Sequence, residues 1–141
     1  MPDVLRSRDA MVAGMSPVLR EGEFVFASTR NLALAERAMS GALSWFVEDE
    51  GVALIVDRQL AASLGFDVSL PIRRIVLGVF SALDGIGLTA AVSTALADAG
   101  VPCNMVSAFH HDSVFVPSAM ADGAMLVLRD LQARAGPLAA S

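Results

Sequence analysis

The chain lacks lysine and tyrosine, and these absences exclude several kinds of chemistry. All ten basic residues are arginines. A Schiff base formed by the protein needs a lysine amine, and a P-loop needs a lysine to reach the phosphates, so neither mechanism is available. Without tyrosine, acid–base chemistry is left to two histidines and the carboxylates.

Cysteine and long apolar runs are also scarce. The single cysteine, Cys103, cannot form an internal disulfide, which favours a cytoplasmic protein. The uncharged stretch from Gly85 to Ala97 is shorter than the roughly 20 residues of a membrane-spanning helix. The start Met1-Pro2-Asp3 does not resemble a signal peptide. We therefore expect no membrane association.

Charge is sparse as well. Charged residues make up 18% of the chain, against about 25% in typical soluble domains, and the mean hydropathy is +0.59. We therefore expect some apolar surface to be covered in a homodimer or a larger homo-oligomer. The net charge of -5 argues against nucleic acid as a partner. The adjacent Arg73 and Arg74 are interpreted as a solvated strand entry rather than a phosphate site.

The most informative segment runs from Ile75 to Gly100. Its first six residues predict a buried strand ending at Phe80, and a glycine turn follows. The next apolar residues recur at helical spacing, and Gly100 stands where a left-handed helix cap is needed. The predicted helix buries a stripe made of Leu88, Ala91, Val92, Ala95, Leu96 and Ala99.

Two hairpins are predicted, each followed by a helix. In the later one, the break His110-His111-Asp112 separates a strand over 105–109 from one over 114–116, and a helix begins at Ser118. The earlier one joins residues 45–47 to 52–56 and leads into a helix begun by Asp57. A strand at residues 24–26 completes a weak internal duplication.

Other segments are less regular. Residues 30–42 form either a helix or an ordered loop. An amphipathic helix is expected to end before Ser16 and to pack on a sheet.

The glycine turn matches a dinucleotide fingerprint formally, as Gly85-x-Gly87-x-x-Ala90. A hairpin follows where a Rossmann unit needs a parallel strand, and Asp84 would repel a phosphate, so we reject this interpretation. The start of the helix can instead bind a carboxylate while Asp84 binds an ammonium group, as an amino acid requires. The alternative is that Asp84 only caps the helix and the glycines only permit the turn.

Several of these segments together resemble the ACT domain. The likeness rests on Leu83–Ala91, Asn104, His110–Pro117 and Glu48–Val56, and is closest to short bacterial proteins made of two ACT-like units. It implies an α+β fold with two ferredoxin-like βαββαβ units, mainly antiparallel sheets and helices on one face. One unit would span 1–70, including the N-terminal helix, and the other 71–141.

The resemblance also implies a small effector, typically an amino acid, and no catalytic residue or cofactor. The protein would act as a regulator or sensor. The implied ligand-binding residues are Asp84, Gly85, Ile86, Gly87, Leu88, Asn104, His111 and Asp112.

Two other functions stay open: a ligand-free protein–protein interaction module, and a small enzyme that uses His111 and Asp112. No metal site is expected, because the adjacent His110 and His111 point to opposite sides of an extended chain. Cys103 is interpreted as a small buried residue rather than a zinc ligand or nucleophile.

Overall fold

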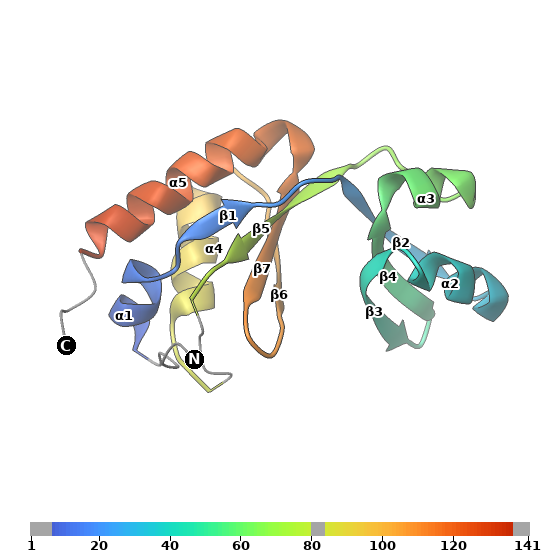
Figure 1. Ribbon diagram of the computed structural model, residues 1–141, viewed down its shortest axis with the longest axis horizontal. Coiled ribbons are helices and arrows are strands. Elements are labelled where there is room, and N and C mark those ends of the chain that lie inside the picture. Colours follow the sequence, from blue (N-terminus) through green and yellow to red (C-terminus); the bar gives the residue numbers. More distant parts are fainter. Residues whose placement is uncertain (1–6, 80–83, 137–141) are drawn as a thin grey trace. The chain divides into compact units, whose positions relative to one another are not determined.

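The computed structural model describes residues 7–79 and 84–136 (Figure 1). The chain divides into two compact units. Residues 22–72 form one, called here the inner unit; residues 1–21 and 73–141 form the other, called here the outer unit. Both combine antiparallel strand pairs with helices, so the expected α+β class is confirmed.

The inner unit is a three-stranded antiparallel sheet in the order β3-β4-β2, with two helices. Both helices begin at side-chain caps: Asn31 Oδ1 accepts from the Leu34 amide at 3.1 Å, and Asp57 Oδ2 accepts from the Leu60 amide at 3.0 Å. The elements are β2 (Phe24–Thr29), α2 (Leu32–Met39), β3 (Ala42–Glu48), β4 (Gly51–Asp57) and α3 (Arg58–Ser63).

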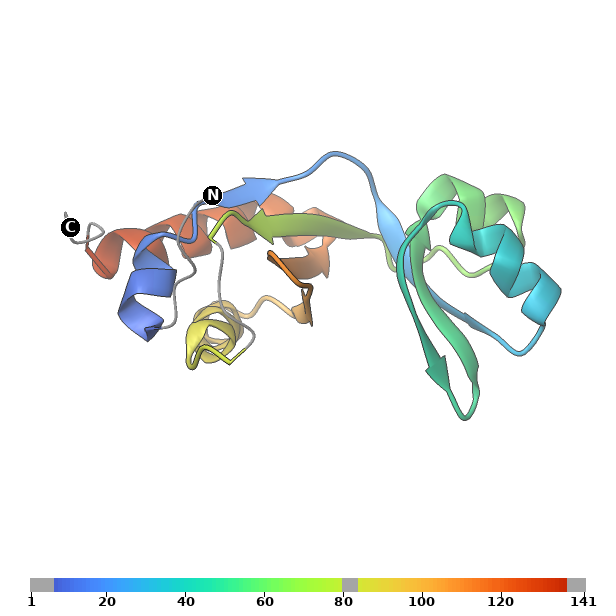
Figure 2. The same cartoon turned by 60° about the horizontal axis from the view of Figure 1, so that its bottom comes forward.

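Helices α2 and α3 cover one face of the inner sheet (Figure 2). In register, Val25 faces Val56 and Ala27 faces Leu54, which places alternate residues of both strands against the helices. The small residues Ala35, Ala38 and Ala61 allow the helices to approach this face, and all of these residues pack into one core cluster.

The outer unit has four strands in the order β1-β5-β7-β6, with α4 between β5 and β6 and α5 after β7. This is the ferredoxin-like order, with the fourth strand supplied by β1, which precedes the inner unit in the chain. The elements are α1 (Arg8–Ala13), β1 (Pro17–Leu19), β5 (Ile72–Leu77), α4 (Leu88–Asp98), β6 (Asn104–Ser107), β7 (Asp112–Pro117), the 3-10 turn Ser118–Met120 and α5 (Ala121–Arg134).

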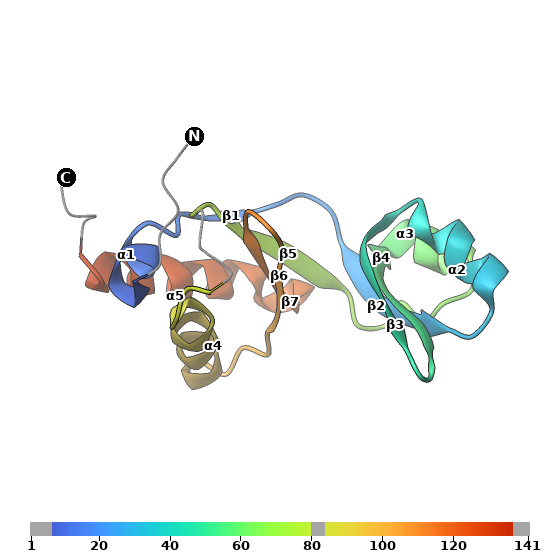
Figure 3. The same ribbon diagram turned by 90° about the horizontal axis from the view of Figure 1, so that it is seen from below.

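The N-terminal segment is built into the outer unit. Helix α1 packs beside α4 and α5 (Figure 3), and Met11, Val12 and Met15 are fully buried in the core. The Gln132 side chain fixes the turn that follows α1: its Nε2 donates to the Ala13 carbonyl at 2.8 Å, and its Oε1 accepts from the Ser16 amide at 3.2 Å. The structure thus groups α1 with residues 73–141, although the sequence-based division at residue 70 grouped it with the first unit.

The element bounds differ from the predicted ones mainly at strand ends. Strand β5 begins at Ile72 rather than Ile75, because Ile72 pairs with Phe24 of β2 and the Arg74 carbonyl accepts from the Arg20 amide. Strand β6 ends at Ser107, and Asp112 belongs to β7 instead of the break. The ambiguous stretch 30–42 contains helix α2. Phe80 lies outside the described residues.

We predict that Gly51→Ala destabilises the protein by about 1–3 kcal/mol, the range for a strained backbone position. Gly51 has φ +140°, and a Cβ there would lie 2.5 Å from the Thr29 carbonyl oxygen. In the matched control, Gly123→Ala in α5, the new Cβ meets nothing within 4 Å. This control should gain about 0.4–1 kcal/mol. Urea denaturation followed by circular dichroism measures both; equal effects would contradict the strain at Gly51.

Candidate functional site

The predicted loop, Asp84 to Leu88, leads directly into α4. Gly87 is the N-cap residue, with φ +107°. As a glycine it has no side chain that could accept a hydrogen bond from the first amides of the helix. Leu88 is buried in the core of the outer unit, so only its backbone amide can face a ligand. The first turn of α4 thus offers amide donors and the positive end of the helix dipole to an anionic group.

The other loop residues lie nearer to solvent. Asp84 is exposed and stands three residues before Gly87, which is the N-cap residue of α4. Gly85 is half-buried, and Ile86 leaves 82% of its surface exposed. An exposed carboxylate and an exposed aliphatic side chain therefore flank the start of α4.

The turn between β6 and β7 lies at the same end of the outer unit as the start of α4 (Figure 1), and His111 belongs to this turn. His111 Nδ1 is 3.4 Å from the Val79 carbonyl oxygen, which ties the β6–β7 turn to the chain just after β5. Asp112, only 7% exposed, sits opposite Ser107 at the closed end of the hairpin. The structure therefore brings His111 and Asp112 toward the C-terminal end of β5, which precedes the loop from Asp84 to Leu88.

Asn104 is placed differently. It is the first residue of β6 and pairs with Phe115, at the end of the hairpin away from the turn. Helix α4 separates it from the loop, and the 11 residues of this helix rise about 16 Å. One small ligand at the loop cannot also contact Asn104 of the same chain.

Arg8 is a neighbour of the loop that sequence reasoning did not find. A Cβ built on Gly87 would lie 2.9 Å from Arg8 Cβ and 3.0 Å from its Cγ and Cδ, so the Arg8 side chain lies directly on the N-cap of α4. Its Nη1 is 3.3 Å from the Asp9 carboxylate, in an exposed ion pair. No local sequence signal links Arg8 to Gly87, because the contact depends on how α1 packs on α4.

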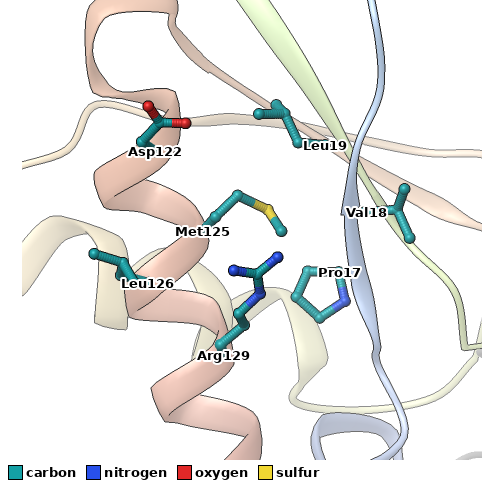
Figure 4. A pocket seen from close by; sticks show the side chains of 7 residues that line it. All are labelled: Pro17, Val18, Leu19, Asp122, Met125, Leu126 and Arg129. Carbon is teal, nitrogen blue, oxygen red and sulfur yellow. The ribbon is translucent and has the colours of Figure 1, made fainter.

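A groove of about 550 Å³ lies elsewhere on the outer unit, between β1 and α5 (Figure 4). Met125 points into it, with Asp122 and Arg129 one turn to either side on α5. Its lining consists of Pro17, Val18, Leu19, Asp122, Met125, Leu126 and Arg129. None of the predicted ligand-binding residues belongs to it.

The described residues contain no group of three histidine, cysteine or acidic side chains that could hold a metal ion. The His110 ring packs edge-on against Phe109, with centroids 4.9 Å apart. Partial burial raises the pKa of the Cys103 thiol, which disfavours the reactive thiolate at neutral pH. Among the described helices, none is long and apolar enough to span a membrane.

Family models of the ACT domain match residues 6–73 and 71–130. The chain belongs to the ACT domain family and carries two such domains in tandem. A protein of unknown function from Vibrio cholerae, described as a possible transport protein, is 32% identical, with 85% of this chain and 91% of that chain covered and a TM-score of 0.75. No curated protein matches significantly.

More distant structures share the fold. The ligand-free regulatory subunit of aspartate kinase from Thermus thermophilus has a TM-score of 0.61 at 10% identity, with 84% of this chain and 97% of that chain covered. A protein from Agrobacterium tumefaciens has a TM-score of 0.61 at 17% identity, with 82% and 87% covered. At these identities the likeness concerns the fold alone.

We predict that Cys103 reacts with a thiol reagent more slowly than a peptide cysteine at neutral pH. Because burial raises its pKa, the thiolate forms only at higher pH, and the midpoint of the pH–rate profile should lie above that of the same protein unfolded in urea. A midpoint below that of the unfolded chain would contradict this and indicate an activated nucleophile.

Proposed function

We propose that the protein binds an amino acid or a similar small effector at the loop from Asp84 to Leu88 and acts as a sensor or regulatory protein without catalysis. The observation that carries this proposal is the start of α4, where the N-cap is a glycine with φ +107° that lies against the Arg8 side chain, three residues after Asp84. The family supports it, since ACT domains generally bind amino-acid effectors.

The chemistry of the loop suits a zwitterion. The α-carboxylate accepts from the first amides of α4 and is attracted by the Arg8 guanidinium. The ammonium group pairs with the Asp84 carboxylate, and the exposed Ile86 provides apolar contact for an aliphatic side chain. A dinucleotide fits less well, because Asp84 would repel its phosphates.

We further propose that the protein is a homo-oligomer that pairs through β3. This strand lies at the edge of the inner sheet, so its outer backbone groups have no partner strand among the described residues. Three consecutive side chains on it are exposed: Trp45 by 52%, Phe46 by 73% and Val47 by 76%. Long, apolar and exposed edge strands are sites of association.

The exposure of consecutive residues favours pairing at the edge over packing on a face. Neighbouring strand residues point to opposite faces of a sheet, so a partner on one face covers Phe46 but not Trp45 and Val47. An antiparallel β3 from a second copy, with its two-fold axis at Phe46, covers both faces. It sets Trp45 opposite Val47 of the second copy.

The same patch favours a second candidate function, a ligand-free interaction module. In that case the exposed β3 binds another protein and the glycine turn is only structural. The two functions differ in whether a small molecule stabilises the protein.

The test of the sensor function is a thermal-shift screen against the twenty amino acids. A ligand at 100 times its Kd should add about 2.7 kcal/mol to stability. Asp84→Ala and Arg8→Ala should each raise the Kd about 10- to 100-fold, as expected for hydrogen bonds to charged groups. Asp122→Ala on α5 is the matched control and should bind normally. Stabilisation by no amino acid would favour the interaction module.

Self-association through β3 can be followed with Trp45, the single tryptophan of the chain. On dilution, its fluorescence should shift to the red as sedimentation velocity shows dissociation. Val47→Lys should raise the dimer Kd at least about tenfold by placing charges in the paired edge. Leu126→Lys in α5, at a residue that is 66% exposed, should leave the dimer Kd unchanged. A wild-type monomer at high concentration would refute this interface.

A further inference from the structure

Three arginines meet where β1 and β5 leave the outer sheet, and they are called here the arginine cluster: Arg20, Arg73 and Arg74. The register pairs Val18 with Val76 and Leu19 with Ile75, and the Arg20 amide donates to the Arg74 carbonyl at 2.9 Å. Arg20 and Arg74 are therefore directly opposite each other. Directly opposed residues share one face of a sheet, so these two positive charges are neighbours.

Arg73 joins them from the neighbouring position on β5. As the neighbour of Arg74 it leaves the strand toward the other face, but its Nη2 donates to the Arg20 carbonyl oxygen at 3.0 Å, which holds its guanidinium against the main chain of Arg20. Three guanidinium groups are thus concentrated on two adjacent strands, within a chain whose net charge is -5.

No acidic side chain among the described residues forms an ion pair with the cluster, although Glu21 follows Arg20 directly. The Nε atoms of Arg73 and Arg74 are buried without a hydrogen-bond partner. Partial burial, and then the charge of Arg20, lower the pKa of Arg74. The opposed positive charges and the unpaired Nε donors both cost stability, because like charges repel and buried donors without acceptors lose their hydration.

We propose that the arginine cluster binds a compact phosphate-type oxyanion, as free phosphate or as the phosphate group of a small metabolite. Guanidinium groups donate in pairs to phosphate oxygens, and a dianion would neutralise most of the local charge. The acidic remainder of the chain argues against a long polyanion such as nucleic acid. No residue of the predicted amino-acid loop takes part, so this site is independent of the proposed function.

The experiment measures the Kd of inorganic phosphate by calorimetry, with wild-type protein and Arg74→Gln, at ionic strength held constant with NaCl. Wild-type protein should bind phosphate, and Arg74→Gln should raise the Kd at least about tenfold. Arg129→Gln in α5 removes the same charge far from the cluster residues in sequence and should bind as wild type. If glycerol phosphate binds more tightly than inorganic phosphate, the bound group belongs to a small metabolite. If the two bind equally, the ligand is free phosphate.

A second readout does not depend on measuring affinity. In buffer free of multivalent anions, Arg74→Gln should melt at a higher temperature than wild type, because it removes one of the opposed charges. In phosphate the order should reverse. Any of three results would overturn the proposal. The two proteins could show the same order of melting temperatures in both buffers, Arg129→Gln could weaken phosphate binding as much as Arg74→Gln, or the protein could bind succinate more tightly than phosphate.

Discussion

The pairing of β1 with β5 is the contact on which the outer unit depends. Strand β1 precedes the inner unit in the chain, yet it supplies the fourth strand of the outer sheet. Because it follows α1 directly, the same pairing holds α1 against α4 and α5, where Gln132 fixes the turn between α1 and β1. The outer unit is therefore complete only when residues far apart in sequence have come together, and the inner unit is an insertion within it.

This arrangement also shapes the candidate site. Helix α1 carries the Arg8 side chain onto Gly87, so a residue of the N-terminal segment borders the start of α4. The β6–β7 turn reaches the same end through His111 and Val79. The β1–β5 pairing likewise sets Arg20 opposite Arg74. The cationic neighbour of the loop and the arginine cluster thus both follow from one strand pairing.

Local sequence signals predicted most of the elements. The spacing of apolar residues gave α4, and its buried side chains Leu88, Ala91, Val92 and Leu96 are among those predicted. Asp57 caps α3 as expected, and Gly100, with φ +74°, ends α4. These predictions succeeded because helical periodicity, caps and positive-φ glycines are encoded within a few residues. Strand ends were less certain, since pairing decides where a strand stops.

The sequence by itself determined the α+β class, the two repeated hairpin–helix units and the glycine turn before α4, because each depends on short-range patterns. Only the tertiary structure decided the strand role of Pro17–Leu19, a segment too short to show alternation, and the membership of α1 in the outer unit. It alone also set Asn104 at the other end of α4 from the loop and brought Arg8 to Gly87. Such contacts are made by packing between distant segments, which no local pattern records.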